Sequence, residues 1–304
     1  MSEFQTNPAL QVSDAIADAV ERAAMVTVLV NARRRMPLSG ISYAPDLVLT
    51  ADHGVHREEN IQVVLTDGTE VAATLAGRDR GSDLALLRLS GGQQMQVARA
   101  AERDVRVGNL VLAVGRPSTD GAQASFGMVN GLGSSLRTER GAMIEQYILT
   151  DAVPYPGFSG GPLVDGDGRV LGINTSGFAP GASLAVPAST AWQVAQALSQ
   201  YGRMRRGFLG IRSQAVELPP GAESALGRRQ ERGLLLVGVE RGQPADQAGL
   251  MVGDILVGLD GNALEDHDNL VRRLAGNVAG STVSAEILRG GRLTRFTVQV
   301  GEKE

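Results

Sequence analysis

The chain has 304 residues, enough for two domains of about 150 residues each. Hydrophobic residues make up 43% and charged residues 20%, so the sequence can bury cores and lacks the composition of a disordered protein. The net charge of −4 argues against a nucleic-acid-binding surface. The absence of cysteine excludes disulfides, a thiol nucleophile and thiolate metal sites. Glycine, at 39 residues, exceeds its usual share of about 7%, which is typical of short strands joined by tight turns.

The N-terminal ten residues are polar and lack the basic start and apolar run of a secretory signal. No apolar stretch reaches the roughly 18 residues that a transmembrane helix needs. As it stands, the sequence predicts a cytoplasmic protein without a membrane span. A truncated form of a periplasmic or other extracytoplasmic protein would look the same.

A helix is expected near the N-terminus. Apolar residues recur at helical spacing from Ile16 to Ala23, after the candidate N-cap Ser13. Residues 1–24 are therefore predicted to be an N-terminal helical segment.

Residues 25–201 are expected to form the first domain. Short apolar runs such as 84–89 alternate with turn signals, among them the Asp67-Gly68 pair that is typical of hairpins. No long helix is expected before about Ser189. Turns spaced in this way indicate paired β-barrels or a sandwich.

A second domain is predicted after the short, basic stretch 202–206, which has the character of a linker. Residues 207–304 mix strand-like runs with helical candidates at 244–248 and 268–274. This segment is long enough for an independent α+β domain.

His53 is the first candidate for catalysis, because histidine is the usual general base near neutral pH. It follows an apolar run, at the point where a barrel strand would meet a loop. Taken alone, the position is better explained by an ordinary histidine at a strand end.

The segment 157–163, GFSGGPL, changes that balance. A serine between glycines lets two backbone N–H groups point at one spot, which is what an oxyanion hole requires. The letters also fit the G-x-S-x-G elbow of α/β-hydrolases, but that elbow needs a helix after the serine, and a strand–turn–strand pattern follows here. A plain glycine-rich turn remains the alternative without catalysis.

Asp83 is the third candidate, a carboxylate at the start of an apolar run. A charge that enters a buried strand needs a partner, and a histidine ring N–H would serve. The chain order is then His53, Asp83, Ser159, which is the order of chymotrypsin-like enzymes.

With these motifs in order, the sequence resembles the HtrA/DegP-like trypsin-fold serine proteases. The likeness rests on TADH around His53, SDLALLRL around Asp83 and TDAVPYPGFSGGPLVDGDGRVLGINT around Ser159. GFLGI and VERGQPADQAGLMVGDILVGLDG resemble the PDZ domain that follows the protease in that family. The resemblance covers residues 25–304 and implies a mainly β chain: a chymotrypsin-like double β-barrel followed by an α+β PDZ domain at 207–304.

The resemblance also implies roles for individual residues. Ser159 would attack the scissile carbonyl, His53 would transfer the proton, and Asp83 would orient the imidazole ring. The oxyanion hole would be formed by the N–H groups of Gly157 and Ser159. The strand expected to pair with the substrate backbone contains Asn174, Thr175 and Ser176. The PDZ segment expected to hold a peptide C-terminus by β-augmentation contains Gly207, Phe208, Leu209, Gly210 and Ile211.

In trypsin-like folds the residue six before the nucleophile lies at the base of the primary specificity pocket, which here is Val153. Leu184 would line the same pocket. Neither carries a charge to pair with Lys or Arg, and an unpaired buried charge is costly. Cleavage after small to medium aliphatic residues is therefore expected.

Two departures from the family stand out. Phe158 occupies a position where the family usually has asparagine, and its bulk could bias the Gly157–Phe158 peptide between active and inactive orientations. The first hairpin, 31–40, leaves no room for the long inserted loop that organises higher cages in some relatives.

Two patterns in the sequence resemble metal sites, but neither gives strong evidence for one. His53 and His56 could ligate a metal together, but the sequence nearby offers no third ligand. Asp165 and Asp167 resemble the start of a calcium loop, but its twelfth position would be Ser176 instead of glutamate, so a hairpin turn is favoured.

Two basic features of the sequence are best interpreted as solvent-exposed side chains. His267 lies near the start of the helix expected beside the peptide groove, where a contact to a ligand side chain is the less favoured interpretation. The arginine triplet at 33–35 lies between two strands, which favours an exposed hairpin tip over a site for an anionic partner.

The sequence therefore predicts an ATP-independent serine endopeptidase, without metal or other cofactor, that cleaves unfolded or damaged polypeptides. Expected partners are unfolded protein or peptide substrates and C-terminal peptides at the PDZ domain, but no nucleic acid. The resemblance implies a homo-oligomer, a trimer. The alternative is a chaperone-like or peptide-sensing protein whose protease is mostly dormant because Phe158 disturbs the oxyanion loop.

Overall fold

A computed structural model describes residues 7–34, 36–133, 136–137, 143–144, 146–177, 183–205, 207–274 and 278–302. The chain divides into two compact units, Met1–Met204 and Arg205–Glu304. The division falls inside the segment 202–206, for which the sequence predicts a linker.

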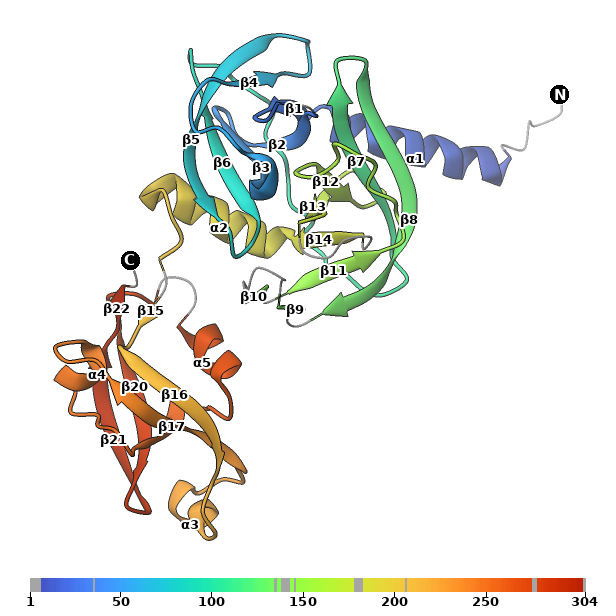
Figure 1. The fold of residues 1–304 in the computed structure, drawn as a ribbon. Helices are drawn as coiled ribbons and strands as arrows, with labels where there is room; N and C mark the ends of the chain where they lie inside the picture. The colour runs from blue at the N-terminus through green and yellow to red at the C-terminus, as the bar shows by residue number, and fades with distance from the viewer. Residues whose placement is uncertain are drawn as a thin grey trace, which may run out of the picture. The chain divides into compact units, whose positions relative to one another are not determined.

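The first unit is mainly β (Figure 1). Its elements are α1 (Pro8–Ala24), β1 (Thr27–Asn31), β2 (Leu38–Ala44), β3 (Leu47–Ala51), the 3₁₀ turn η1 (Asp52–Gly54), β4 (Ile61–Val64), β5 (Glu70–Asp79), β6 (Leu84–Leu89), β7 (Leu110–Ser118), β8 (Gly121–Gly133), β9 (Leu136–Arg137), β10 (Met143–Ile144), β11 (Tyr147–Thr150), β12 (Pro162–Val164), β13 (Val170–Thr175), β14 (Leu184–Pro187) and α2 (Ala188–Tyr201).

Two closed barrels make up this unit. The first has the strand order β1-β2-β3-β6-β5-β4, and the second has the order β11-β14-β13-β12-β7-β8. Neighbouring strands pair antiparallel, as in β3 with β6, where Thr50 lies opposite Ala85. The predicted double barrel is therefore confirmed.

Each barrel has its own apolar interior, and a larger cluster joins the two. Val30, Val48 and Leu87 belong to the first interior, and Val111 and Leu163 belong to the second. The joining cluster takes side chains from both barrels and from both helices, and it includes Ala19, Leu49, Leu86, Leu112, Val114, Ile173 and Leu198. Burial of this apolar surface fixes the position of one barrel relative to the other. This position matters because the candidate site lies between the barrels.

The N-terminal helix is longer than the sequence pattern indicates. It begins at Pro8, where the side chain of Asn7 accepts a hydrogen bond from the N–H of Ala9 at 3.0 Å. Asparagine as N-cap followed by proline in the first turn is a common helix start. The pattern from Ser13 onward reflects only the half that packs on the barrels, where Ala19 and Ala23 are buried.

The second unit is an α+β domain. Its elements are β15 (Gly207–Phe208), β16 (Ile211–Glu217), α3 (Ala222–Leu226), β17 (Arg232–Val239), α4 (Pro244–Gln247), β18 (Ile255–Leu259), β19 (Asn262–Ala263), α5 (His267–Arg273), β20 (Thr282–Arg289), β21 (Arg292–Gln299) and β22 (Gly301–Glu302). The main sheet has the order β16-β17-β18-β20-β21, and β15 pairs with β22. Helices α4 and α5 correspond to the two helical candidates of the sequence.

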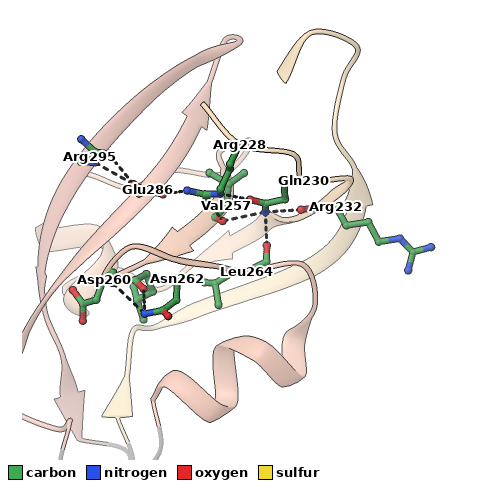
Figure 2. A network of polar contacts seen from close by, with 10 residues as sticks. Arg228, Gln230, Arg232, Val257, Asp260, Asn262, Leu264, Glu286 and Arg295 are labelled. Atoms are coloured by element: carbon green, nitrogen blue, oxygen red, sulfur yellow. Dashed lines mark hydrogen bonds and ion pairs between the residues drawn. The ribbon is translucent and has the colours of Figure 1, made fainter. Parts of the chain in front are cut away.

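A buried polar network ties the sheet of the second unit together (Figure 2). The carboxylate of Glu286 accepts hydrogen bonds from Arg228 at 2.7 Å and from Arg295 at 3.0 and 3.1 Å. The amide of Gln230 donates to the carbonyl groups of Val257 and Leu264, each at 3.0 Å. Because each partner is satisfied, the network adds rigidity instead of leaving unpaired buried charge.

The Glu286 carboxylate should make stability depend on pH. Burial favours its neutral form, but hydrogen bonds and charge from Arg228 and Arg295 outweigh burial and hold the pKa of Glu286 below its ordinary value. A depressed folded-state pKa contributes stability above the unfolded-state pKa of about 4.3, and this contribution disappears as pH falls through the folded-state pKa. In thermal unfolding of the full chain, Glu286→Gln should therefore lower Tm at pH 7, and the difference from wild type should shrink in acid. An equal difference at every pH would contradict this account.

Candidate active site

His53 lies in η1, directly after strand β3 of the first barrel. The turn is anchored by Asp52, whose carboxylate accepts a hydrogen bond from Arg78 Nε at 2.6 Å. Arg78 also donates to the carbonyl group of Val55 at 3.0 Å. The backbone that carries the histidine is thus fixed on both sides.

Asp83 holds His53 through two hydrogen bonds. One carboxylate oxygen accepts from the His53 backbone N–H and the other contacts His53 Nδ1, each at 2.7 Å. The side chains are 7% exposed for Asp83 and 18% for His53, so water weakens the pair little. This geometry favours the tautomer with a proton on Nδ1 and leaves Nε2 to act as a base.

The backbone at Asp83 is unusual, with φ of 55° in the left-handed region. Aspartate tolerates this region better than most residues. The Asp83 carbonyl group accepts a hydrogen bond from the Asp52 N–H at 2.9 Å, which joins the start of β6 to η1. The strained turn therefore aims the carboxylate at the histidine.

The carboxylate has a further partner in the second barrel. Thr175, at the end of β13, donates its hydroxyl to the same Asp83 oxygen that contacts His53 Nδ1. The Thr175 hydroxyl also accepts from the N–H of Gly177 at 3.0 Å. Sequence reasoning placed Thr175 on the substrate strand and missed this contact, which only the docking of the barrels creates.

The loop before Ser159 forms a tight turn. The N–H of Phe158 donates to the carbonyl group of Tyr155 at 2.9 Å, and Gly157 has φ of 92°. Proline at the second position and glycine with positive φ at the third are typical of a type II turn. Among the described residues, the N–H groups of Gly157 and Ser159 have no hydrogen-bond partner. Two such donors on either side of one residue are what an oxyanion hole requires.

Phe158 points into the core of the second barrel. Its side chain is fully buried with Val111 and Leu163 and makes an edge-to-face contact with Tyr155, with ring centroids 5.5 Å apart. A Cβ at Gly115 would lie 2.5 Å from the Phe158 ring, so glycine leaves the room that the ring occupies. The bulky residue is accommodated beneath the turn and does not block it.

The Ser159 hydroxyl is turned toward Ser176, with 3.1 Å between the two Oγ atoms. In the part of the chain that the structure describes, no hydrogen bond connects Ser159 with His53. Rotation of the serine side chain is therefore needed before His53 can take its proton. Catalytic hydrogen bonds often tighten only when substrate binds.

The strand expected to pair with substrate is only partly available. The N–H of Asn174 donates to Gly161 at 2.9 Å, and its carbonyl group accepts from Gly160 at 2.8 Å. Thr175 is buried and paired with Leu184 of β14. The expectation for Asn174 and Thr175 is corrected because Gly160 and Gly161 already use the backbone groups of Asn174, and β14 pairs with Thr175. Ser176, which is exposed, is left for this role.

The residues expected to form the specificity pocket lie elsewhere. Val153 is 53% exposed and so is not the floor of an enclosed pocket. Leu184 is buried in the cluster that joins the barrels, with Leu112 and Ile173. The placement of these two residues in the pocket is therefore corrected: the offset from the nucleophile does not carry over to this loop.

The peptide-binding segment predicted in the second unit lies where β15 leads into β16. Leu209 is buried, and its carbonyl group accepts from the N–H of Ala245 at 2.8 Å. The carbonyl group of Gly210 accepts from Glu240 at 2.8 Å, with φ of 75° at Gly210. Within the described ranges, the N–H groups of Leu209 and Gly210 have no hydrogen-bond partner.

The remaining members of this segment are tied to the fold. Gly207 and Phe208 pair with β22, and the N–H of Gly207 donates to the carbonyl group of Leu274 at 2.7 Å. Ile211 starts β16, opposite Val239. These contacts hold the two free N–H groups in place.

The weaker motifs form no site among the described residues. His56 is exposed, and its Nε2 lies 3.2 Å from the carbonyl oxygen of His53. Asp165 accepts the N–H groups of Asp167 and Arg169 in a hairpin turn, as expected. His267 is exposed at the start of α5. No cluster of three or more metal-ligating side chains is present in the described part of the chain.

Comparisons with known proteins agree with this geometry. A family model for the trypsin-like peptidase domain matches residues 38–173, and one for the PDZ domain matches residues 207–300. The solved structure of the HtrA-type protease AlgW with a tripeptide is 30% identical, with a TM-score of 0.76 over 95% of this chain and 97% of that chain. The serine endoprotease from Yersinia pestis is 28% identical, with a TM-score of 0.74 over 99% of this chain and 100% of that chain.

Curated relatives point the same way. The periplasmic pH-dependent serine endoprotease DegQ of Escherichia coli (strain K12) is 34% identical over 258 residues, 83% of this chain and 56% of that protein. A probable periplasmic DegP-like serine endoprotease of Rhizobium meliloti (strain 1021) is 33% identical over 276 residues, 88% of this chain and 54% of that protein. The chain thus spans about half the length of these relatives.

The fold and the site define a trypsin-like peptidase domain followed by a PDZ domain. The chain belongs to the HtrA-type family of serine proteases. The family predicted from the three motifs is confirmed. None of the helices in the described part of the chain combines the length and the hydropathy that a membrane-spanning helix needs.

Proposed function

We propose that this chain is an ATP-independent serine endopeptidase of protein quality control that cleaves unfolded or damaged polypeptides. Ser159 is the nucleophile, His53 the general base and Asp83 the group that orients His53. The observation that carries the proposal is the largely buried His53–Asp83 pair, with two hydrogen bonds of 2.7 Å, in the same unit as a turn that presents the free N–H groups of Gly157 and Ser159.

The reaction begins when the Ser159 side chain rotates from Ser176 to His53 Nε2. As Ser159 Oγ attacks the scissile carbonyl carbon, its proton passes to Nε2. Asp83 stabilises the imidazolium that forms, with support from the Thr175 hydroxyl. The imidazolium then protonates the leaving amine, and the acyl-enzyme is hydrolysed when His53 takes a proton from water.

Charge develops on the carbonyl oxygen in both steps. The N–H groups of Gly157 and Ser159 are positioned to receive it, because they have no other partner in the described chain. Donors that are oriented before the reaction stabilise an oxyanion without reorganisation, and one such donor accounts for about 10²–10³ in kcat.

The PDZ domain is proposed to bind peptide C-termini through the segment 207–211. The N–H groups of Leu209 and Gly210 would donate to the terminal carboxylate, and the peptide would extend along β16, against which α5 packs. The solved relative AlgW, described with a tripeptide, supports a peptide as ligand.

Two further features rest on the family. A homotrimer is proposed for the assembly, and light scattering of the purified chain tests it. A location outside the cytoplasm is proposed because the relatives from Escherichia coli and Rhizobium meliloti are named periplasmic. The cytoplasmic location predicted from the sequence finds no support in these relatives.

A mostly dormant protease that acts as a chaperone-like or peptide-sensing protein is the second candidate. The contact of the Ser159 hydroxyl with Ser176, at 3.1 Å, favours it, because the nucleophile is turned away from its base. Phe158 does not favour it, since its side chain is buried beneath the turn.

Digestion of casein, with and without ATP and with EDTA, tests the main proposal. Cleavage should proceed in all three conditions, and a fluorophosphonate probe should label Ser159. Loss of activity in EDTA that zinc or calcium restores would contradict the proposed side-chain chemistry. Protection of unfolded protein from aggregation without labelling would favour the dormant candidate.

The cleavage preference stays a prediction. Cuts are expected after Val, Ala, Ile or Leu, as the resemblance to the family implies, although Val153 and Leu184 do not form an enclosed pocket. One methylene changes such discrimination by about 1–3 kcal/mol, so the preference should be graded. Mass analysis of casein fragments measures it, and a profile dominated by Lys and Arg would contradict it.

A further inference from the structure

Ser39 lies in β2 of the first barrel and is fully buried, yet both its side chain and its backbone contact the nucleophile loop of the second barrel. Its hydroxyl donates to the carbonyl group of Gly157 at 2.7 Å. Its backbone N–H donates to the carbonyl group of Ser159 at 3.1 Å. One residue thus binds the carbonyl groups of both residues whose N–H groups form the proposed oxyanion hole.

The bond to Gly157 fixes the direction of a peptide plane. The carbonyl oxygen of Gly157 and the N–H of Phe158 belong to the same planar unit, and they bind Ser39 Oγ and the Tyr155 carbonyl group respectively. The N–H of Gly157 lies in the adjoining Pro156–Gly157 plane, so the two backbone dihedrals of Gly157, with φ at 92°, set its direction relative to the held plane. A rotated plane would turn that N–H out of the oxyanion hole.

The Ser39 hydroxyl is itself held in place. It accepts a hydrogen bond from the Arg116 N–H at 2.8 Å, so its proton is directed to Gly157. The Ser39 carbonyl group accepts from the Thr50 hydroxyl at 2.6 Å. Every polar group of Ser39 therefore has a partner, and two of the four contacts are with the nucleophile loop.

We propose that Ser39 is a positioning residue of the oxyanion hole, which holds the Gly157–Phe158 peptide in the orientation that catalysis needs. The inference rests on the proposed protease function of the same site. Ser39 touches no substrate and acts through Gly157 and Ser159. A residue with this role should affect the transition state more than substrate binding.

The test is Ser39→Ala in the full chain, assayed with an aliphatic peptide amide. We expect kcat to fall about 10- to 100-fold, somewhat less than for loss of an oxyanion donor, with KM changed less than about threefold. A peptide boronate, whose tetrahedral adduct with Ser159 Oγ uses the oxyanion hole, should lose affinity by the same factor as kcat/KM. The pH dependence of kcat/KM, which reports His53, should keep its midpoint.

Ser42→Ala is the matched control. Ser42 lies in the same strand, is also buried, and its hydroxyl donates to the backbone carbonyl groups of Val26 and Gln96, away from the nucleophile loop. Ser39→Ala leaves the buried Gly157 carbonyl group without its donor, and Ser42→Ala removes the hydroxyl contact with the Gln96 carbonyl group, so both variants should lower Tm. Only Ser39→Ala should lower kcat and boronate affinity. If Ser39→Ala does not fold, Ser39→Cys and Ser42→Cys replace the pair, because the slightly larger thiol fills the site but is only a weak hydrogen-bond donor.

The outcomes separate this inference from the proposed function. If wild type shows hydrolysis that depends on Ser159 while Ser39→Ala retains wild-type kcat, the positioning role is wrong and the protease function stands. An equal loss of kcat in the Ser39 and Ser42 variants also contradicts the role, because general destabilisation then explains it. Absence of hydrolysis that depends on Ser159 overturns both.

Discussion

Ser159→Ala and His53→Ala should each lower kcat for a peptide amide by about 10⁴- to 10⁶-fold, with the thermal unfolding curve close to that of wild type. Alanine removes the attacking oxygen in one case and the base in the other, and Ser159 Oγ has only the Ser176 hydroxyl as a partner among the described residues. The double variant should be no slower than either single variant, since the two groups act as one unit. Active-site labelling and peptide hydrolysis measure both effects.

His56→Ala is the control for the histidine. His56 is exposed and touches the backbone carbonyl group of His53 and not its ring, so most activity should remain. An inactive His56→Ala protein combined with an active His53→Ala protein would show that the base has been assigned to the wrong residue.

Gly177→Ala should disable the same site although it replaces none of the three proposed catalytic residues. A Cβ at Gly177 would lie 2.6 Å from Asp83 Oδ2 and 2.8 Å from His53 Nδ1, closer than real Cβ contacts allow. The pair must separate, and the imidazole loses its orientation. We expect kcat to fall by about 100-fold or more, up to the roughly 10⁴-fold that loss of the orienting carboxylate costs in such triads.

Gly166→Ala provides the comparison for a glycine substitution. A Cβ at Gly166 would meet no atom within 4 Å, and the residue has no positive φ, so alanine is accepted there without strain. The kcat and Tm of this variant should match those of wild type. Unchanged kcat in Gly177→Ala would mean that the segment after β13 moves away and does not hold the His53–Asp83 pair.

Some of the site could be identified from the sequence because each motif is local. His53 follows an apolar strand, Asp83 precedes one, and Ser159 lies among glycines, so each could be found within a few residues. Thr175 and Ser39 could not be found in this way. Each reaches from one barrel to a catalytic element of the other, and no short-range pattern encodes the docking of two barrels.

The prediction of the residues that line the specificity pocket does not hold, for a different reason. Counting back six residues from Ser159 leads to Val153 only if the intervening loop has a fixed shape. The turn at 155–158 and the burial of Phe158 leave Val153 on the surface. The helix start at Pro8 was missed although its signal is local: Asn7 followed by proline is a cap that the apolar periodicity from Ile16 onward obscured.

Because the site lies between two barrels, its catalytic activity depends on how the barrels are docked. The contacts from Thr175 to Asp83 and from Ser39 to Ser159 both cross between the two barrels, which also share the joining apolar cluster. A slight loosening of the cluster that joins the barrels would break these contacts while each barrel kept its own hydrogen-bonded ladder. Heating should therefore inactivate the enzyme before its strands unfold, and early inactivation of this kind would be reversible on cooling.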